Sequence, residues 1–131
     1  MLVNERMTRN PGYVGSQHTL AAAKALMDMD DIRHVPVVEG GKLVGILTDR
    51  DLQNHAGYLD STLVDAAMVR DPVTAAPEMT VETAALLLIT NHVRALPVVD
   101  NGHLVGIITT TDLLGALLDV LQAIRETWEN G

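Results

Sequence analysis

The chain carries one sequence pattern twice, in the same order and without a gap. Residues 33–38 read Arg-His-Val-Pro-Val-Val and return 61 positions later as Arg-Ala-Leu-Pro-Val-Val. Residues 43–52 return at the same offset, and both copies open with a Met-x-x-x-Pro sequence, at Met7 and Met68. A repeat of this length is a supersecondary unit used twice. We therefore predict two copies of one unit, packed across a pseudo-twofold axis around a shared core.

The length of 131 residues fits a single domain, whereas one repeat alone is near the size at which burial becomes marginal. We expect residues 1–131 to form one module. Its first repeat should span about residues 3–55, its linker about 55–62 and its second repeat about 63–118, with a helical extension to about residue 128.

Each repeat shows the same order of structural signals, which predicts a β-α-β-β-α unit of the α/β class. A threonine precedes each first helix as a candidate N-cap, and a proline opens the next strand, where its missing N–H is tolerated. Glycine-containing turns then join the strands of a hairpin. The elements are expected at residues 12–14 and 73–75, after Thr19 and Thr80, at 36–38 and 97–99, at 43–48 and 104–109, and from residues 49 and 110. A short helix capped by Thr62, residues 63–68, should precede the second repeat.

The last helix, predicted for residues 112–128, shows more apolar surface than one helix of a small domain normally buries. Its stripe contains Leu114, Leu117, Leu118, Leu121, Ile124 and Trp128. The apolar run at residues 86–89 adds surface that one core cannot easily hide. We expect a homodimer to cover these surfaces.

Charge and composition exclude several classes of function. The net charge of −8 argues against nucleic acids and anionic membranes as partners. The chain has no cysteine, which removes disulfides and thiolate chemistry, and its five histidines show no metal-ligand spacing. No signal peptide opens the chain, and no apolar run approaches the roughly 20 residues of a membrane span. We expect a cytoplasmic protein that requires no metal or resident cofactor.

The sequence Gly-Ile-Leu-Thr-Asp-Arg-Asp at residues 45–51, which returns as Gly-Ile-Ile-Thr-Thr-Thr-Asp at residues 106–112, leads from a strand into a helix. The helix N-terminus and the hydroxyl of Thr48 or Thr109 suit a phosphate group. An ionised Asp51 or Asp112 can accept two hydrogen bonds from a vicinal diol such as a ribose. The same Thr-x-x-Asp spacing also resembles a capping box, and the two roles are compatible.

These motifs, together with the Met-x-x-x-Pro openings, resemble tandem cystathionine-β-synthase (CBS) motifs, and the pair resembles a Bateman module. Short pairs of this kind are similar to the CBS part of bacterial acetoin-utilisation regulators. The resemblance implies two clefts for adenosine compounds: AMP, ADP, ATP, S-adenosylmethionine or a dinucleotide. It implies that the threonine reaches phosphate, the aspartate reaches ribose, and the strands containing Val35, Pro36, Leu96 and Pro97 wall the purine. It also implies that Arg33 and Arg94 can approach phosphates, although both could equally be solvated.

The two copies differ at positions near this candidate site. The first repeat offers His34 and Arg50 where the second has Ala95 and Thr111, so it carries more positive charge. Tyr13 matches Thr74, and the tyrosine could either stack on a purine or fill its pocket.

Three functions remain open from the sequence. The first is a non-enzymatic sensor of an adenosine ligand that acts on a separate, unidentified protein partner. The second is a structural dimerisation module whose pockets no longer bind. The third is an enzyme that acts on a nucleotide, although no set of catalytic residues can be placed by spacing.

Overall fold

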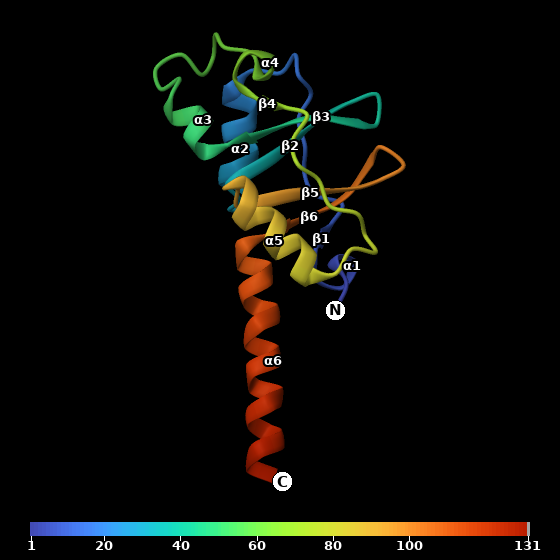
Figure 1. The fold of residues 1–131 in the computed structure, drawn as a ribbon. Helices are drawn as coiled ribbons and strands as arrows, with labels where there is room; N and C mark the ends of the chain where they lie inside the picture. Colours follow the sequence, from blue (N-terminus) through green and yellow to red (C-terminus); the bar gives the residue numbers. More distant parts are fainter. Residues whose placement is uncertain (131) are drawn as a thin grey trace.

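The structure is a computed structural model and describes residues 1–130. It consists of two similar halves that lie side by side, with one long helix extending from them (Figure 1). Along the chain, the first repeat supplies α1 (Val3–Arg6), β1 (Thr8–Arg9), α2 (Leu20–Asp30), β2 (His34–Glu39), β3 (Lys42–Thr48) and α3 (Asp49–Gln53). The second repeat supplies α4 (Val64–Ala67), β4 (Val69–Arg70), α5 (Val81–Asn91), β5 (Ala95–Asp100), β6 (His103–Thr109) and α6 (Thr110–Asn130). The α/β fold class and the repeated unit are confirmed.

The two hairpins have the same register, down to an irregularity at the same position. β2 pairs with β3 from His34↔Thr48, and β5 pairs with β6 from Ala95↔Thr109. Two-residue turns close both hairpins, and all four turn residues have positive φ, including Asn101 at 52° and Gly102 at 82°. A single Lys42↔His103 pair joins the hairpins into one sheet.

The short segments at the start of each copy are exchanged between the halves, which the sequence did not reveal. β1 pairs with β6 of the second repeat, and β4 pairs with β3 of the first. Val3 accordingly belongs to the core of the second repeat and Val64 to the core of the first, both fully buried. The exchange ties the repeats together, because neither core is complete without residues from the other copy.

Gly45 and Gly106 make this exchange possible. A Cβ atom at Gly45 would lie 2.9 Å from the carbonyl oxygen of Val69 and 2.7 Å from the sulfur of Met68. A Cβ at Gly106 would lie 2.9 Å from the carbonyl oxygen of Thr8 and would overlap the Met7 sulfur. At each glycine, the backbone that approaches closely is therefore that of the exchanged segment from the other repeat.

Several predicted boundaries were wrong. Pro36 and Pro97 are the third residues of their strands, where the missing N–H faces an edge bridged only at Val14 or Ala75. The segments at 12–14 and 73–75, which were predicted as strands, form only these single bridges. Thr62 caps no helix; its hydroxyl donates to the Tyr58 carbonyl at 2.7 Å, and α4 begins after Leu63. The last helix starts at Thr110, as the motif predicted, and ends at Asn130, beyond the predicted end at about residue 128.

Candidate ligand-binding site

Both Thr-x-x-Asp motifs form capping boxes at the start of a helix. In the first, the backbone N–H and hydroxyl of Thr48 donate to Oδ2 of Asp51 at 2.8 and 3.0 Å, and the Asp51 N–H donates to Thr48 Oγ1 at 3.3 Å. In the second, the corresponding bonds between Thr109 and Asp112 measure 2.9, 3.1 and 3.3 Å. The capping interpretation of the motif is therefore correct for both copies.

The caps leave half of each carboxylate available. Within residues 1–130, the second oxygen, Oδ1, accepts no hydrogen bond from another residue at either Asp51 or Asp112. Both aspartate side chains are half-buried, so part of each remains accessible to solvent. A carboxylate oxygen has two acceptor sites, so each motif can act as a cap and still accept hydrogen bonds from a diol.

Arg33 and Arg94 lie directly beside the caps. The carbonyl of Arg33 accepts the N–H of Asp49, and the carbonyl of Arg94 accepts the N–H of Thr110, both at 3.0 Å. Both arginines and Arg50 are exposed, and within the described chain none of the three forms an ion pair. Three of nine basic residues thus remain unneutralised around the starts of α3 and α6 in an otherwise acidic protein.

His34 is half-buried and is affected by charged groups of both repeats. Its pKa is lowered, first by burial and then by the positive charges of Arg94 and Arg33, while Asp49 opposes the shift. Arg94 belongs to the second repeat and His34 to the first, so the charge of one repeat acts on a side chain of the other. An anion bound near His34 would raise this pKa.

The strand residues expected to wall a purine have buried side chains. Val35 and Leu96 are fully buried in the cores of the first and second repeats. Pro36 and Pro97 are also fully buried, on the opposite strand face. Ile46 and Ile107, their partners in register, form a cluster with Ala95. Because these side chains are buried, a ligand beside the strands would contact their backbone N–H and C=O groups.

Tyr13 and Thr74 each line a hollow that also includes residues of the hairpins. Tyr13 is 59% exposed. It lines a hollow of about 250 Å³ with Asn10, Pro11, Val38, Gly41, His103 and Leu104. Thr74 lines the symmetry-related hollow of about 210 Å³. Tyr13 directly precedes Val14, which bridges Val37 of β2 and donates its N–H to the Pro36 carbonyl at 3.1 Å.

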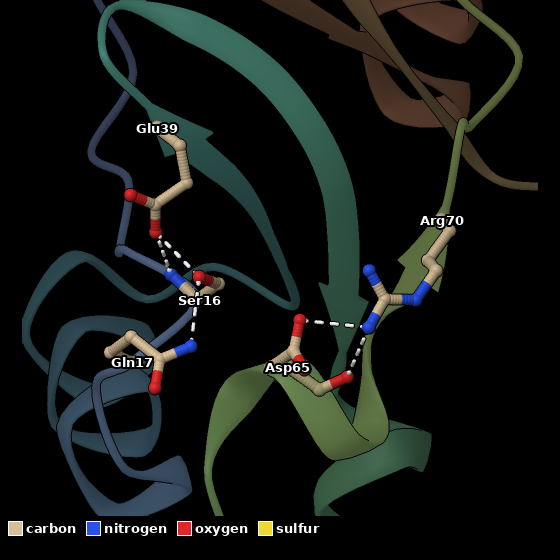
Figure 2. Close-up of polar contacts among 5 residues, drawn as sticks. All are labelled: Ser16, Gln17, Glu39, Asp65 and Arg70. Atoms are coloured by element: carbon tan, nitrogen blue, oxygen red, sulfur yellow. Dashed lines mark hydrogen bonds and ion pairs between the residues drawn. The ribbon is translucent and has the colours of Figure 1, made fainter.

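One polar contact near the first repeat's loop was missed from the sequence. The N–H and the hydroxyl of Ser16 both donate to one oxygen of Glu39 at 2.6 Å, as Figure 2 shows. These bonds lower the pKa of Glu39, the hydroxyl bond having the larger effect. In the second repeat Pro77 occupies the Ser16 position and has neither donor. Comparing the aligned copies for lost donors could have indicated this difference.

Two further features bear on the range of partners. Within the described residues, no helix combines the length and apolar character needed to cross a membrane. The same part of the chain contains no cluster of three or more histidine and acidic side chains arranged to hold a metal ion.

Comparison with known proteins agrees with this architecture. Solved structures with similar folds include a Vibrio cholerae protein assigned to acetoin utilization (AcuB), at 35% identity, with a TM-score of 0.83 and 96% of both chains covered. The CBS domain pair of protein MJ0100, in complex with 5′-methylthioadenosine and S-adenosyl-L-methionine, is 27% identical, with a TM-score of 0.83 over 89% of this chain and 95% of that one. CBSX2 in complex with AMP is 28% identical, with a TM-score of 0.79 over 91% and 97%.

The sequence also matches a family model in two stretches. The CBS domain model covers residues 3–57 and 64–119, one stretch for each repeat, and leaves the end of α6 outside. The suspected resemblance is thereby confirmed, including the likeness to an acetoin-utilization protein. The chain belongs to the CBS domain family and carries the domain twice, as a CBS pair.

Proposed function

We propose that this CBS pair is a non-enzymatic regulatory module that binds an adenosine-containing ligand next to its Thr-x-x-Asp motifs. The observation that carries the proposal is that both capping boxes leave one carboxylate oxygen free, and that an exposed arginine is hydrogen-bonded through its backbone carbonyl to the start of each helix. Two similar CBS pairs are solved with S-adenosyl-L-methionine, 5′-methylthioadenosine or AMP, which supports the adenosine part of the ligand.

The chemistry of the site suits the two polar parts of a nucleotide. The free oxygens of Asp51 and Asp112 supply acceptors for ribose hydroxyls, as a diol requires. The exposed guanidinium groups of Arg33 and Arg94 supply charged donors for phosphate or carboxylate oxygens. Arg50 adds positive charge in the first repeat only, so ligands with more phosphates should prefer the site that includes Thr48 and Asp51.

A ligand bound between the repeats can regulate because both repeats contribute to its site. It favours whichever arrangement of the repeats it binds more tightly, and it can shift their equilibrium only by that difference in affinity. We propose that a separate protein partner, or the module's own self-association, responds to this shift. The purely structural alternative gains support from the exposed apolar face of α6.

The test compares Asp51→Asn and Asp112→Asn with the parent by calorimetry against AMP, ATP and S-adenosylmethionine. Asparagine retains a carbonyl oxygen for the cap but loses the charge and one acceptor oxygen. Because hydrogen bonds to charged groups contribute about 1.5–3 kcal/mol, affinity at the altered site should fall at least about tenfold.

Two matched variants control this measurement. Asp60→Asn removes the same charge from the exposed linker. Thr19→Ala removes a helix cap, the Thr19 acceptor of the Ala22 N–H, away from the motifs. Both should bind like the parent. If the parent binds none of the three compounds, or if both aspartate variants bind as it does, the structural alternative replaces the sensor.

A further inference from the structure

The two Thr-x-x-Asp motifs lead into helices of very different length. α3 has five residues and ends at Gln53, whereas α6 has 21 residues and continues to Asn130. Figure 1 shows α6 leaving the sheet and extending well beyond both halves of the protein. The second motif is therefore the start of a long continuous helix, while the first motif leads into the linker after about one and a half turns.

α6 is attached to the body of the protein only along its first part. Leu113 packs against the core of the second repeat, and Ala116, at 3% exposure, is the only buried residue of the helix. All residues from 117 to 130 are exposed. Within the described chain, the last polar contact between α6 and the body is an ion pair of 2.6 Å between Arg6 of α1 and Asp119. A tilt of α6 about Ala116 would therefore be opposed by few contacts.

The start of α6 contains groups that the proposed ligand would touch. Asp112 lies in its first turn and keeps one carboxylate oxygen free. The N–H and the hydroxyl of Thr110 both donate to the Arg94 carbonyl, at 3.0 and 3.1 Å, so the backbone of Arg94 is tied to the same turn. A ligand that bonds Asp112 thus acts on α6 itself.

The first motif is connected differently. After α3 the chain turns back through residues 54–62, where the carbonyls of Leu59 and Thr62 accept the N–H groups of Ala21 and Leu20 at the start of α2. α2 and α3 also contribute to the same core, that of the first repeat. A shift of α3 is therefore passed to α2 and to this core, and it does not act directly on α6.

The position of Ala116 makes a small shift at the motif larger at the far end of the helix. At 1.5 Å per residue, the segment from Thr110 to Ala116 is about 9 Å long, and the segment from Ala116 to Glu126 is about 15 Å long. Helices of regulated proteins typically shift by about 1–2 Å between states. With Ala116 as the pivot, such a shift at Thr110 would move Glu126 by about 2–3 Å.

We propose that α6 is the output lever of the module, and that a ligand at the second motif moves it whereas a ligand at the first motif does not. The inference rests on the proposed function, because it assigns the regulation to one of the two sites. A ligand that bonds both Asp112 and the body favours the position of α6 in which it makes both sets of contacts, and it shifts the helix by that difference in affinity.

The absence of cysteine from the chain allows spin labels to be attached to introduced cysteines alone. Glu126→Cys on α6 is paired with Glu82→Cys on α5 and, separately, with Ala25→Cys on α2; all three residues are exposed. Two reference positions are needed because a tilt can leave one distance unchanged. The Ala25–Glu82 pair reports on the body alone. Dilution with unlabelled chains keeps each measured pair within one copy.

AMP, ATP and S-adenosylmethionine are the ligands for this measurement. Binding should change at least one of the two distances to residue 126 by about 2–3 Å, and it should change the Ala25–Glu82 distance by less than about 1 Å. Calorimetry on the same labelled chains gives the occupancy of the sites.

Asp51→Asn and Asp112→Asn make the same chemical change at the two motifs. At a ligand concentration of about twice the parent's Kd, a tenfold loss of affinity at one site leaves that site mostly empty. Asp112→Asn should therefore lose most of the distance change. Asp51→Asn should retain it, although its first site binds more weakly.

Three results would overturn the inference. Binding without a change in either distance to residue 126 would leave the sensor in place and remove the lever. A change that the Ala25–Glu82 pair shares, or that Asp51→Asn loses as fully as Asp112→Asn, would mean that the whole module rearranges. Failure of the parent to bind any of the three compounds would overturn the proposed function and the lever with it.

Discussion

Asp51 and Asp112 close their capping boxes with hydrogen bonds that match to within 0.1 Å, yet the side chains around the two boxes differ in charge. The first repeat has His34 where the second has Ala95, and its Ser16 donates to Glu39 where the second repeat has Pro77. The helices that the boxes start differ as well, since α3 has five residues and α6 has 21.

This contrast separates what builds the fold from what distinguishes the sites. The glycines under the exchanged segments and the capping threonines are the same in both repeats, and the turns Gly40-Gly41 and Asn101-Gly102 both have positive φ. Some positions near the motifs differ in charge, as Arg50 and Thr111 do. Two sites with the same backbone scaffold can therefore prefer different ligands. Variants that change the shared glycines or the differing polar residues test how far the two repeats are equivalent.

The largest effects are expected from Gly45→Ala and Gly106→Ala. Each new Cβ would contact a backbone carbonyl at 2.9 Å, and backbone cannot move aside as a flexible side chain can. Overpacking of this kind costs about 1–3 kcal/mol, and we expect similar losses in the free energy of unfolding at both positions. Chemical denaturation measures both.

Gly115→Ala in α6 is the control for these variants. A Cβ there meets open space, so alanine should stabilise the helix by up to about 1 kcal/mol. If Gly45→Ala were harmless while Gly106→Ala was not, the exchanged segments would hold the two halves unequally, and the structural equivalence would fail.

The sequence predicted the repeat, the hairpins and the caps because each depends on local signals. Asn101-Gly102 favours the tight turn that it forms. The hydroxyl oxygens of Thr19 and Thr80 each accept a hydrogen bond from the backbone N–H of the third residue after them. The exchange of β1 and β4 could not be predicted in this way. Two-residue strands have no periodicity, and their partners lie in the other repeat.

The candidate site was predicted in its residue types and less well in its geometry. The copies of the motif indicated Thr48, Asp51, Thr109 and Asp112, and the structure adds that each aspartate retains a free oxygen. The hollow beside Tyr13 is lined by residues of both repeats, and only the three-dimensional path of the chain brings them together.

A smaller effect is expected from His34→Ala, which gives the first repeat the residue of the second. The pKa of His34 is lowered in the folded chain, mainly by burial, so below about pH 6.5 the unfolded chain binds more protons than the folded one. Stability should therefore fall as the pH drops from 6.5 through the lowered pKa. The variant lacks this loss, so its melting temperature should decrease less than the parent's over that range.

His103→Ala, which removes an imidazole from an exposed position, is the comparison variant. Equal slopes for the parent and His34→Ala would show that the pKa of His34 is not lowered in the folded chain. His34 also gives a test of the ligand proposal. An anion bound between Arg33 and Arg94 would raise the pKa of His34. Ligand binding near pH 6 should then be accompanied by proton uptake, which calorimetry in buffers of different ionisation enthalpy detects.

The smallest effect is expected from Ser16→Ala, which removes a donor that the second repeat also lacks. The Ser16 hydroxyl is the main cause of the lowered pKa of Glu39, so this pKa should rise toward its usual 4.5 in the variant. A lowered carboxylate pKa stabilises the folded chain above the unfolded value and loses that contribution as the pH falls through the folded value. The parent should therefore be slightly more stable than Ser16→Ala at neutral pH, and the difference should vanish in acid. Glu39 is exposed, so solvent screening keeps the difference small, and a carboxyl NMR titration is the more sensitive measurement. Ser61→Ala, an exposed serine that bonds only the Tyr58 carbonyl, should leave the Glu39 titration unchanged. A Glu39 pKa that is the same with and without Ser16 would remove this contact from the differences between the two repeats.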